Sequence, residues 1–238
     1  MNDAASHGRP VAAFDFDKTL INIDVAYHFL DTAIKRCRVR RLAAGILMPV
    51  LLPLLLLRPS RIIAMSTMMW IATFPLRGRT ARDVFSAFAA GVFSPPLNGR
   101  FYDEGLSALA AHQRLGHQCL IISGSPQELV RQVARTMLKQ DIVVIGSQVS
   151  PFLGGLVYRR YCMGTGKIKL AKARGLLHGH WGYGYSDSAS DVPLLAHCRH
   201  RFLVNPGKKT IKRVKAALGG RVTLLNWAKT TIENLDKN

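Results

Sequence analysis

Two aspartates directly after a short apolar segment constrain this chain more than any other feature. Residues 10–14 are apolar and predict a buried strand, and Asp15 and Asp17 follow it. Two carboxylates this close repel each other and raise each other's pKa unless a cation lies between them. Mg²⁺ is the natural companion because it takes oxygen ligands, and an aspartate beside it can form an acyl-phosphate. Such a pair on its own is more often a turn with two solvated acids, so its meaning depends on the other motifs.

A second apolar strand is expected at 120–122, and it ends in Ser123 and Gly124. Pro126 suits the first turn of a following helix, so Ser123 is expected near helix-end amides that can bind phosphate. Later segments add a lysine at the start of a helix, and two acids that follow a short aromatic strand. Each motif alone has a plain structural explanation, but four of them in order at strand ends and helix starts indicate one site. The residues that the later segments contribute are Lys167, Asp187 and Asp191.

The order of these motifs resembles the haloacid dehalogenase superfamily of phosphohydrolases, in the branch that contains phosphoserine phosphatase. The resemblance extends from Asp15 to Pro206. It implies an α/β fold with a Rossmann-like, doubly wound parallel sheet and an inserted α-helical cap. The implied division is a phosphatase core at 8–23 and 99–238 and a cap at 24–98.

The resemblance also assigns catalytic roles to the motif residues. Asp15 is the implied nucleophile and Asp17 the implied general acid and base. Ser123 would donate a hydrogen bond to the transferring phosphoryl group beside Gly124, and Lys167 would neutralise its charge. These roles agree with the chemistry of phosphoryl transfer, in which cations offset charge on the phosphoryl oxygens while a carboxylate attacks in line.

Mg²⁺ is the cofactor that the resemblance implies. Its implied ligands are Asp15, Asp17 and Asp187, and Asp191 would support either the metal or the lysine. One residue departs from the superfamily pattern, because Ser186 precedes Asp187 where many members have glycine. The departure leaves the geometry of this turn open.

The remaining pattern predicts further elements of a doubly wound core, since strands and helices alternate along the chain. Gly116 is a suitable end for a preceding amphipathic helix. The predicted elements are a helix at 100–115, a strand at 142–146, a loop or hairpin at 148–160, helices at 168–177 and 192–196, and a strand at 201–205.

The charge balance indicates an anionic partner. The 238 residues include 33 Lys and Arg against 14 Asp and Glu, a formal net charge of +19, and residues 32–82 contain ten basic residues and no acid. Nucleic acid and an acidic membrane surface both fit such a balance. Four scattered cysteines favour a reducing compartment over disulfides or zinc. The absence of an apolar signal-peptide core leads us to expect the catalytic part in the cytoplasm.

The apolar pattern of the basic region favours the membrane. Residues 42–57 are a run of sixteen uncharged residues, and a second uncharged run covers 62–76. As a helix, the first run would reach about 24 Å, short of the roughly 30 Å hydrocarbon core. Pro49 and Pro53 are expected to bend or break it. A buried hairpin inside the cap is the alternative, but a small cap has little core in which to hide so continuous an apolar run.

Topology narrows the arrangement of this apolar hairpin. Asp15 and Ser123 must share one site, so the chain between them can cross a membrane only an even number of times. Two full crossings would place Arg58 and Arg61 on the far side, against the tendency of basic residues to stay cytoplasmic. The sequence therefore predicts a membrane-associated hairpin at 42–76 that lies in, or dips into, the cytoplasmic leaflet.

Several short patterns resemble the phosphatidylglycerophosphatases of the bacterial inner membrane. This resemblance implies removal of the terminal phosphate of phosphatidylglycerophosphate, at the cytoplasmic face of the inner membrane. The implied partners are an anionic phospholipid membrane and a lipid phosphomonoester, with no nucleic acid and no obligate protein partner. The matching residues are Met65-Ser66, Trp70, Thr73-Phe74, 123–127, Ser147-Gln148, Cys162, Gly164, Lys167 and 184–188.

Two other functions remain open from the sequence. A soluble phosphatase for small molecules such as phosphoserine or histidinol phosphate would have a compact cap with polar exposed helices, which the run at 42–57 does not fit. A non-catalytic basic module that binds nucleic acid or membrane would have no use for Asp15, Asp17, Lys167 and Asp187.

Overall fold

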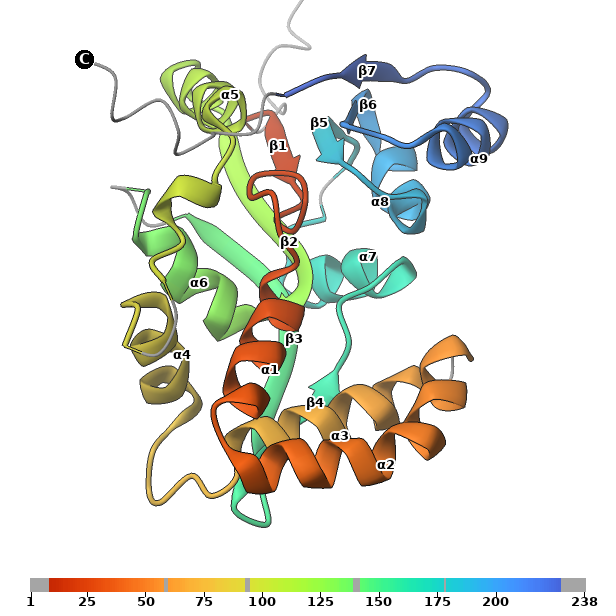
Figure 1. The fold of residues 1–238 in the computed structure, drawn as a ribbon. Coiled ribbons are helices and arrows are strands. Elements are labelled where there is room, and N and C mark those ends of the chain that lie inside the picture. Colours follow the sequence, from red (N-terminus) through yellow and green to blue (C-terminus); the bar gives the residue numbers. More distant parts are fainter. Residues whose placement is uncertain (1–8, 58–59, 93–94, 139–141, 178, 228–238) are drawn as a thin grey trace, which may run out of the picture.

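The fold is built on one mixed, mainly parallel sheet (Figure 1). The computed structural model describes residues 9–57, 60–92, 95–138, 142–177 and 179–227. Within them, seven strands have the order β4-β3-β2-β1-β5-β6-β7, and neighbouring strands are parallel except for the antiparallel pair β3 and β4. The strands are β1 (Val11–Phe14), β2 (Gln118–Pro126), β3 (Val143–Phe152), β4 (Gly155–Arg160), β5 (Trp181–Ser186), β6 (Cys198–Val204) and β7 (Thr223–Leu225).

Helices cover both faces of this sheet, as a doubly wound fold requires. On one face, Phe14 of β1 packs in a buried cluster with Leu109 and Val130. The preceding residue, Ala13, packs instead with Leu170 in a second cluster. The alternation along β1 therefore builds two cores, and the predicted α/β class is confirmed. The covering helices are α5 (Asp103–Arg114) and α6 (Gln127–Arg135) on the first side, and α7 (Thr165–Ala173), α8 (Val192–Ala196) and α9 (Lys208–Leu218) on the other.

The predicted elements are confirmed, with shifted ends. The helix expected at 100–115 is α5, and Gly116 follows it with φ +73°, the conformation expected of a C-terminal stop. The strand expected at 142–146 extends to Phe152, because the segment at 148–160 is the β3–β4 hairpin and not an irregular loop.

Four helices follow β1 in the segment expected to form the cap. Asp24 begins the first of them by accepting a hydrogen bond from the Tyr27 amide at 2.8 Å. Thr80 and Asp83 form a reciprocal capping box at the start of the last one. These helices are α1 (Val25–Lys35), α2 (Arg38–Leu56), α3 (Arg61–Thr73) and α4 (Ala81–Ala89). The domain limits drawn from the sequence stay a prediction, and Arg58 lies outside the described residues.

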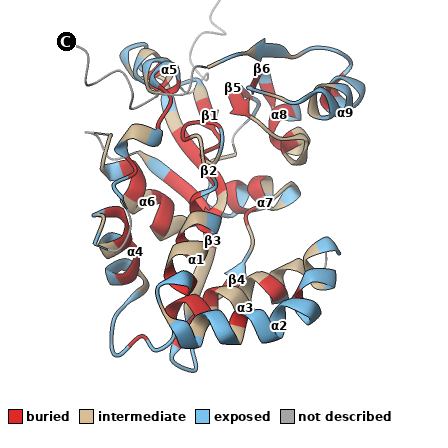
Figure 2. Ribbon diagram, viewed as in Figure 1, coloured by how far each residue is buried: buried red, intermediate tan, exposed pale blue. Residues whose placement is uncertain are grey.

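Of the two effects expected of its prolines, a bend or a break, the long helix α2 excludes the break. Pro49 and Pro53 lie inside α2, and the helix continues through both of them to Leu56 instead of breaking. Both prolines are exposed, so their rings meet no packed neighbour, and solvent can reach the carbonyls that they leave without an amide partner. Figure 2 shows exposed residues along the outer side of α2.

The β3–β4 hairpin extends beyond the sheet and packs against α3 (Figure 1). The Trp70 indole donates hydrogen bonds to the carbonyls of Phe152 and Leu153, at 3.1 and 3.2 Å. Thr73 Oγ1 accepts from the Leu156 amide at 2.8 Å, and the Ser66 hydroxyl oxygen accepts from a second amide of β4. Residues of α3 thus occupy hydrogen-bonding groups that an edge strand would otherwise expose.

Close packing of this hairpin on α3 predicts opposite effects for two glycine substitutions. A Cβ on Gly155 would lie 2.6 Å from the Trp70 ring, whereas a Cβ on Gly45 in α2 would meet nothing within 4 Å. We expect Gly155→Ala to lower the free energy of unfolding by about 1–3 kcal/mol. Gly45→Ala should raise it by up to about 1 kcal/mol, because alanine favours a helix. Urea denaturation of the two variants measures both changes in the free energy of unfolding. Equal free energies of unfolding for the two variants would contradict the packing of Gly155 on Trp70.

Candidate active site

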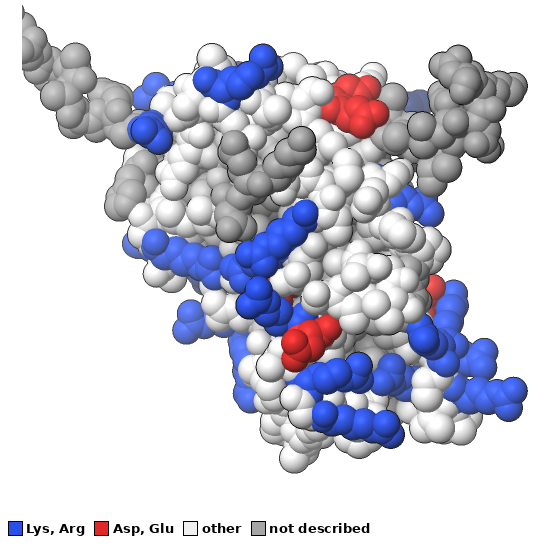
Figure 3. Space-filling view, turned by 90° about the vertical axis from the view of Figure 1, so that its left-hand side faces the viewer, with Lys and Arg blue, Asp and Glu red and all other residues white. Residues whose placement is uncertain are grey.

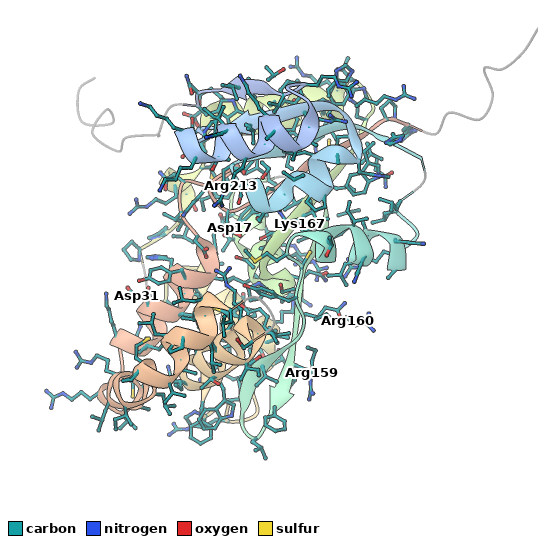
Figure 4. All side chains as sticks on the ribbon, turned by 90° about the vertical axis from the view of Figure 1, so that its right-hand side faces the viewer. Asp17, Asp31, Arg159, Arg160, Lys167 and Arg213 are labelled. Atoms are coloured by element: carbon teal, nitrogen blue, oxygen red, sulfur yellow. The ribbon has the colours of Figure 1, made fainter. Side chains whose placement is uncertain are left out.

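The predicted site residues converge at the carboxyl ends of three adjacent strands. Asp15 follows β1, Ser123 lies in β2, and Asp187 follows β5, and β1 lies between the other two strands. The chain builds β2 and β3 on one side of β1 and later adds β5 to β7 on the other. This is the switch point at which open α/β sheets bind ligands. Figure 4 shows Asp17 and Lys167 between the core and the cap helices.

Lys167 is the centre of the site. Its Nζ donates to Asp15 Oδ1 and to Asp191 Oδ2, each at 2.6 Å, and all three side chains are buried. Thr19 Oγ1 donates to the other oxygen of Asp15 at 3.3 Å, and Ser186 Oγ donates to Asp191 Oδ2 at 2.7 Å. Asp191 thus contacts the lysine, which is one of the two roles expected for it, and its part in the chemistry stays a prediction. Ser186, which departs from the superfamily pattern, orients that supporting carboxylate.

The two carboxylates keep Lys167 charged. Burial alone would lower the pKa of this lysine, but Asp15 and Asp191 outweigh burial and raise its pKa above the ordinary value. A protonated ammonium is therefore fixed beside the expected nucleophile. It is placed to offset negative charge on a group attached to Asp15.

Asp17 is held by three hydrogen bonds from two parts of the chain, the end of β2 and the start of α1. Its Oδ2 accepts from Ser123 Oγ at 2.6 Å and from Ser125 Oγ at 2.7 Å, and its Oδ1 accepts from the Val25 amide at 2.7 Å. Burial and the nearby Asp24 carboxylate raise the pKa of Asp17, and the hydrogen bonds oppose that rise only in part. A carboxyl group with a raised pKa is suited to donate a proton to a leaving group and take it back.

Ser125 is a functional residue that the sequence reasoning missed. The motif Ser123-Gly124-Ser125 was recognised, but only its first two residues were given a role. Ser123 donates its proton to Asp17 in this structure and accepts from the Ser125 amide at 2.9 Å. Its predicted contact with phosphate stays a prediction. The signal for Ser125 was the second hydroxyl in the same turn.

A cavity of about 730 Å³ opens from these residues into the cap. One end is lined by the catalytic carboxylates, Lys167, Gly124 and Ser125. The lining from α1, α2 and α3 is mainly apolar, with the charged residues Asp31, Lys35, Arg41 and Arg61 among it, so a single space joins a charged end to a mainly apolar end. The apolar lining residues are Ala26, Leu30, Ile34, Ala44, Met48, Leu55, Met65 and Met68.

Comparison with known proteins agrees with this arrangement. Residues 12–196 match the haloacid dehalogenase-like hydrolase family. The chain belongs to this family. A probable phosphatase of Mycobacterium tuberculosis H37Rv is 32% identical over 117 residues, which are 45% of this chain and 38% of that protein. The inhibition of morphological differentiation protein of Streptomyces azureus is 29% identical over 124 residues, 50% of this chain and 44% of that protein. The matches thus span less than half the length of these relatives.

Solved structures show the same haloacid dehalogenase fold. A protein of unknown function from Bordetella pertussis Tohama I has a TM-score of 0.67 at 21% identity, over 91% of this chain and 99% of that one. A phosphoserine phosphohydrolase-like protein from Francisella tularensis has a TM-score of 0.55 at 15% identity, over 91% and 94% of the two chains. Phosphoserine phosphatase in its apo form has a TM-score of 0.53 at 12% identity, over 87% of this chain and 91% of that one. At identities this low, the similarity shows a shared fold and no shared activity.

Phosphatases of this family generally depend on Mg²⁺, and the charges of the site fit a divalent cation. Four carboxylates, those of Asp15, Asp17, Asp187 and Asp191, act on one another here, and only Asp15 and Asp191 contact the Lys167 ammonium group. Burial raises the pKa of Asp15 well above its ordinary value, Lys167 opposes this, and the other three carboxylates add to it. Burial and Asp191 also raise the pKa of Asp187 to about 6, although Lys167 and Lys18 oppose the rise. A divalent cation would relieve the remaining repulsion.

Asp15 and Asp187 are the carboxylates that would hold Mg²⁺. Among the described residues, no three His, Cys, Asp or Glu side chains form a group that could hold a metal. Mg²⁺ commonly binds through one or two carboxylates and takes its other ligands from water and substrate phosphate, so the pair is sufficient. Both carboxylate oxygens of Asp17 accept hydrogen bonds from the protein, so its role as a ligand stays a prediction.

Mg²⁺ should stabilise the folded protein, because it binds the carboxylates only where folding brings them together. We expect saturating Mg²⁺ to raise the melting temperature by about 5 °C at neutral pH. The rise should shrink toward pH 5, since protonation of Asp187 competes with the metal. Asp187→Asn should lose most of the rise, and Asp103→Asn, an exposed acid of α5 that does not line the cavity, should retain it. A wild-type melting temperature that is independent of Mg²⁺ would remove the metal assignment.

Proposed function

We propose that this protein is a membrane-associated, Mg²⁺-dependent phosphomonoesterase that converts phosphatidylglycerophosphate to phosphatidylglycerol and inorganic phosphate. The observation that carries the proposal is the single cavity that joins the catalytic carboxylates to an apolar space between cap helices. A phosphorylated lipid headgroup has the same two-part character. A phosphatase for small polar molecules would have no use for the apolar end.

The chemistry follows from the residues at the charged end. Asp15 attacks the phosphorus atom and forms an aspartyl-phosphate, while Asp17 donates a proton to the departing glycerol oxygen. Asp17 then takes a proton from water, which attacks the phosphorus atom and releases inorganic phosphate and free Asp15. Lys167 offsets charge on the phosphoryl oxygens throughout, and bound Mg²⁺ supplies further positive charge there.

The outer face of α2 supports a place at the membrane. Four apolar side chains, Leu42, Ile46, Val50 and Leu56, are 64–79% exposed along this face. An apolar surface with no protein partner in the described structure is typical of membrane-binding helices. The tip of the β3–β4 hairpin adds exposed Phe152 and Leu153 at the same end of the molecule (Figure 1).

Basic residues support an anionic membrane as the partner. The net charge of +19 is attracted to acidic headgroups. Figure 3 shows many more Lys and Arg than Asp and Glu side chains on one face of the molecule. We therefore propose the cytoplasmic face of the bacterial inner membrane, whose anionic lipids would attract the basic enzyme.

The prolines of α2 favour an interfacial position over a complete span. Within the described residues, α2 alone is long and apolar enough to cross a membrane by length and composition. However, Pro49 and Pro53 leave the carbonyls of Gly45 and Pro49 without their helical donors. Unsatisfied carbonyls are costly in hydrocarbon but can bind water at the headgroups. The helix would therefore lie along the leaflet with its outer face in the acyl boundary.

Asp15→Asn should abolish phosphate release, because a neutral amide cannot form the acyl-phosphate. We expect a loss of at least about 10⁴-fold on phosphatidylglycerophosphate in vesicles. Circular dichroism should confirm that the variant is folded, and Asp103→Asn, outside the cavity, should retain activity near the wild-type level. Turnover of the Asp15→Asn protein within about tenfold of wild type would show that Asp15 is not the nucleophile.

The outer face of α2 can be tested without disturbing the core. Replacing Leu42, Ile46, Val50 and Leu56 with Ser should abolish flotation with anionic vesicles, because it removes the apolar surface that would enter the membrane. The fold should be retained, because each of these side chains is already exposed. Activity on the vesicle-borne lipid should fall by more than about tenfold, with hydrolysis of a small soluble ester retained. The control carries Leu115→Ser and Leu224→Ser, which remove exposed apolar side chains outside the cap helices. Complete release of the wild-type protein by salt alone would contradict apolar insertion.

A further inference from the structure

Two polar side chains in the wall of the cavity have no role in the chemistry described so far. Arg61 is the first residue of α3, and its Nε is buried without a hydrogen-bond partner among the described residues. Tyr158 on β4 is only 5% exposed, and its hydroxyl is also buried without a partner there. Both residues line the cavity that contains the catalytic carboxylates.

Ring contacts and electrostatic interactions connect these two groups to each other and to the catalytic residues. The Tyr158 ring packs edge-on against Tyr161, with centroids 5.5 Å apart. The charge of Arg61 acts on the Tyr161 hydroxyl, and Asp17 acts electrostatically on both tyrosines, so the group is near the general acid. Along α3, Arg61 is followed at helical spacing by Met65 and Met68, which line the apolar end.

The unpartnered atoms define the ligand that would satisfy them. A guanidinium group has only donors, and it binds phosphate oxygens with a planar, two-pronged geometry. A buried donor without an acceptor is costly, and a buried charge without an opposite charge is more so. An anionic oxygen group would satisfy Arg61 and accept a hydrogen bond from the Tyr158 hydroxyl.

We propose that Arg61 and Tyr158 bind a second phosphate of the substrate, a phosphodiester on the leaving-group side of the scissile phosphomonoester. The inference rests on the proposed function and deepens it. The order along the cavity is then phosphomonoester at Lys167, phosphodiester at Arg61, and acyl chains beside Met65 and Met68. The preferred substrate class is a phosphomonoester whose alcohol carries a phosphodiester a few atoms away.

Soluble headgroup compounds test this subsite without a membrane. The first is glycerophosphoglycerol phosphate, which has both phosphates, and the second is glycerol 3-phosphate, which has only the monoester. Wild-type protein should have the higher kcat/KM on the first compound. Arg61→Ala should lower kcat/KM on that compound by about 100-fold and change the value on glycerol 3-phosphate by less than about threefold.

Matched variants separate recognition from folding. Tyr158→Phe should lower kcat/KM by about tenfold on the two-phosphate compound and leave the value on glycerol 3-phosphate unchanged, because only the hydroxyl is removed. Arg61→Lys should recover part of the preference, since it retains the charge but not the planar fork. Arg159→Ala removes an exposed arginine of β4 that does not line this cavity (Figure 4), and it should leave both activities unchanged.

Three results would overturn the subsite. They are the absence of any wild-type preference for the second phosphate, an equal loss of both activities in a folded Arg61→Ala variant, and no change of either activity in that variant. Failure of the lipid assignment gives a different pattern. In that case the soluble preference and its loss in Arg61→Ala persist, but phosphatidylglycerophosphate in vesicles is not hydrolysed by the wild-type protein.

Discussion

The ammonium group of Lys167 is the interaction on which the rest of the structure depends. It joins Asp15 and Asp191, which are 152 and 24 residues away in the chain, at 2.6 Å each. Without that cation, two buried carboxylates would face each other unpaired, which is strongly unfavourable. The contact therefore draws α7 and the turn after β5 against the end of β1. It also places a fixed positive charge beside the nucleophile, so the arrangement that completes the core is the one that phosphoryl transfer needs.

The cap and the hairpin extend this rigidity to the rest of the cavity. Ser66 and Thr73 of α3 accept hydrogen bonds from β4 amides, including that of Tyr158. Because Arg61 begins the same helix, the two members of the proposed phosphodiester subsite are fixed relative to each other before any ligand arrives. A preorganised pair of donors loses little conformational entropy on binding. The hairpin is thus a wall of the cavity as well as an edge of the sheet.

Much of the fold and most of the site residues could be predicted from the sequence, because they depend on local patterns. Apolar runs that end in Asp15, Ser123 and Asp187 reveal strands and their carboxyl ends directly. Hydrogen bonds between distant segments could not be predicted in this way. The contacts of Ser125 and Val25 with Asp17 depend on strand register and on where the first cap helix begins.

The pattern Ser66, Trp70 and Thr73 supported a resemblance, but its part in holding the hairpin appears only when α3 and β4 are placed together. The break that Pro49 and Pro53 allowed does not occur, because the carbonyls that they free can bind solvent on the exposed side of α2, while the bend expected of them stays a prediction.

The amide of Val25 gives the cap an influence on proton transfer. This amide is the first of α1, and it donates to Asp17 Oδ1 at 2.7 Å, an interaction that lowers the pKa of Asp17. Asp24, the residue that caps α1, acts in the opposite direction and raises this pKa, as burial does. The start of one cap helix thus supplies both a hydrogen-bond donor and a negative charge to the expected general acid. The cap therefore helps to set the proton affinity of Asp17 as well as forming a wall of the cavity.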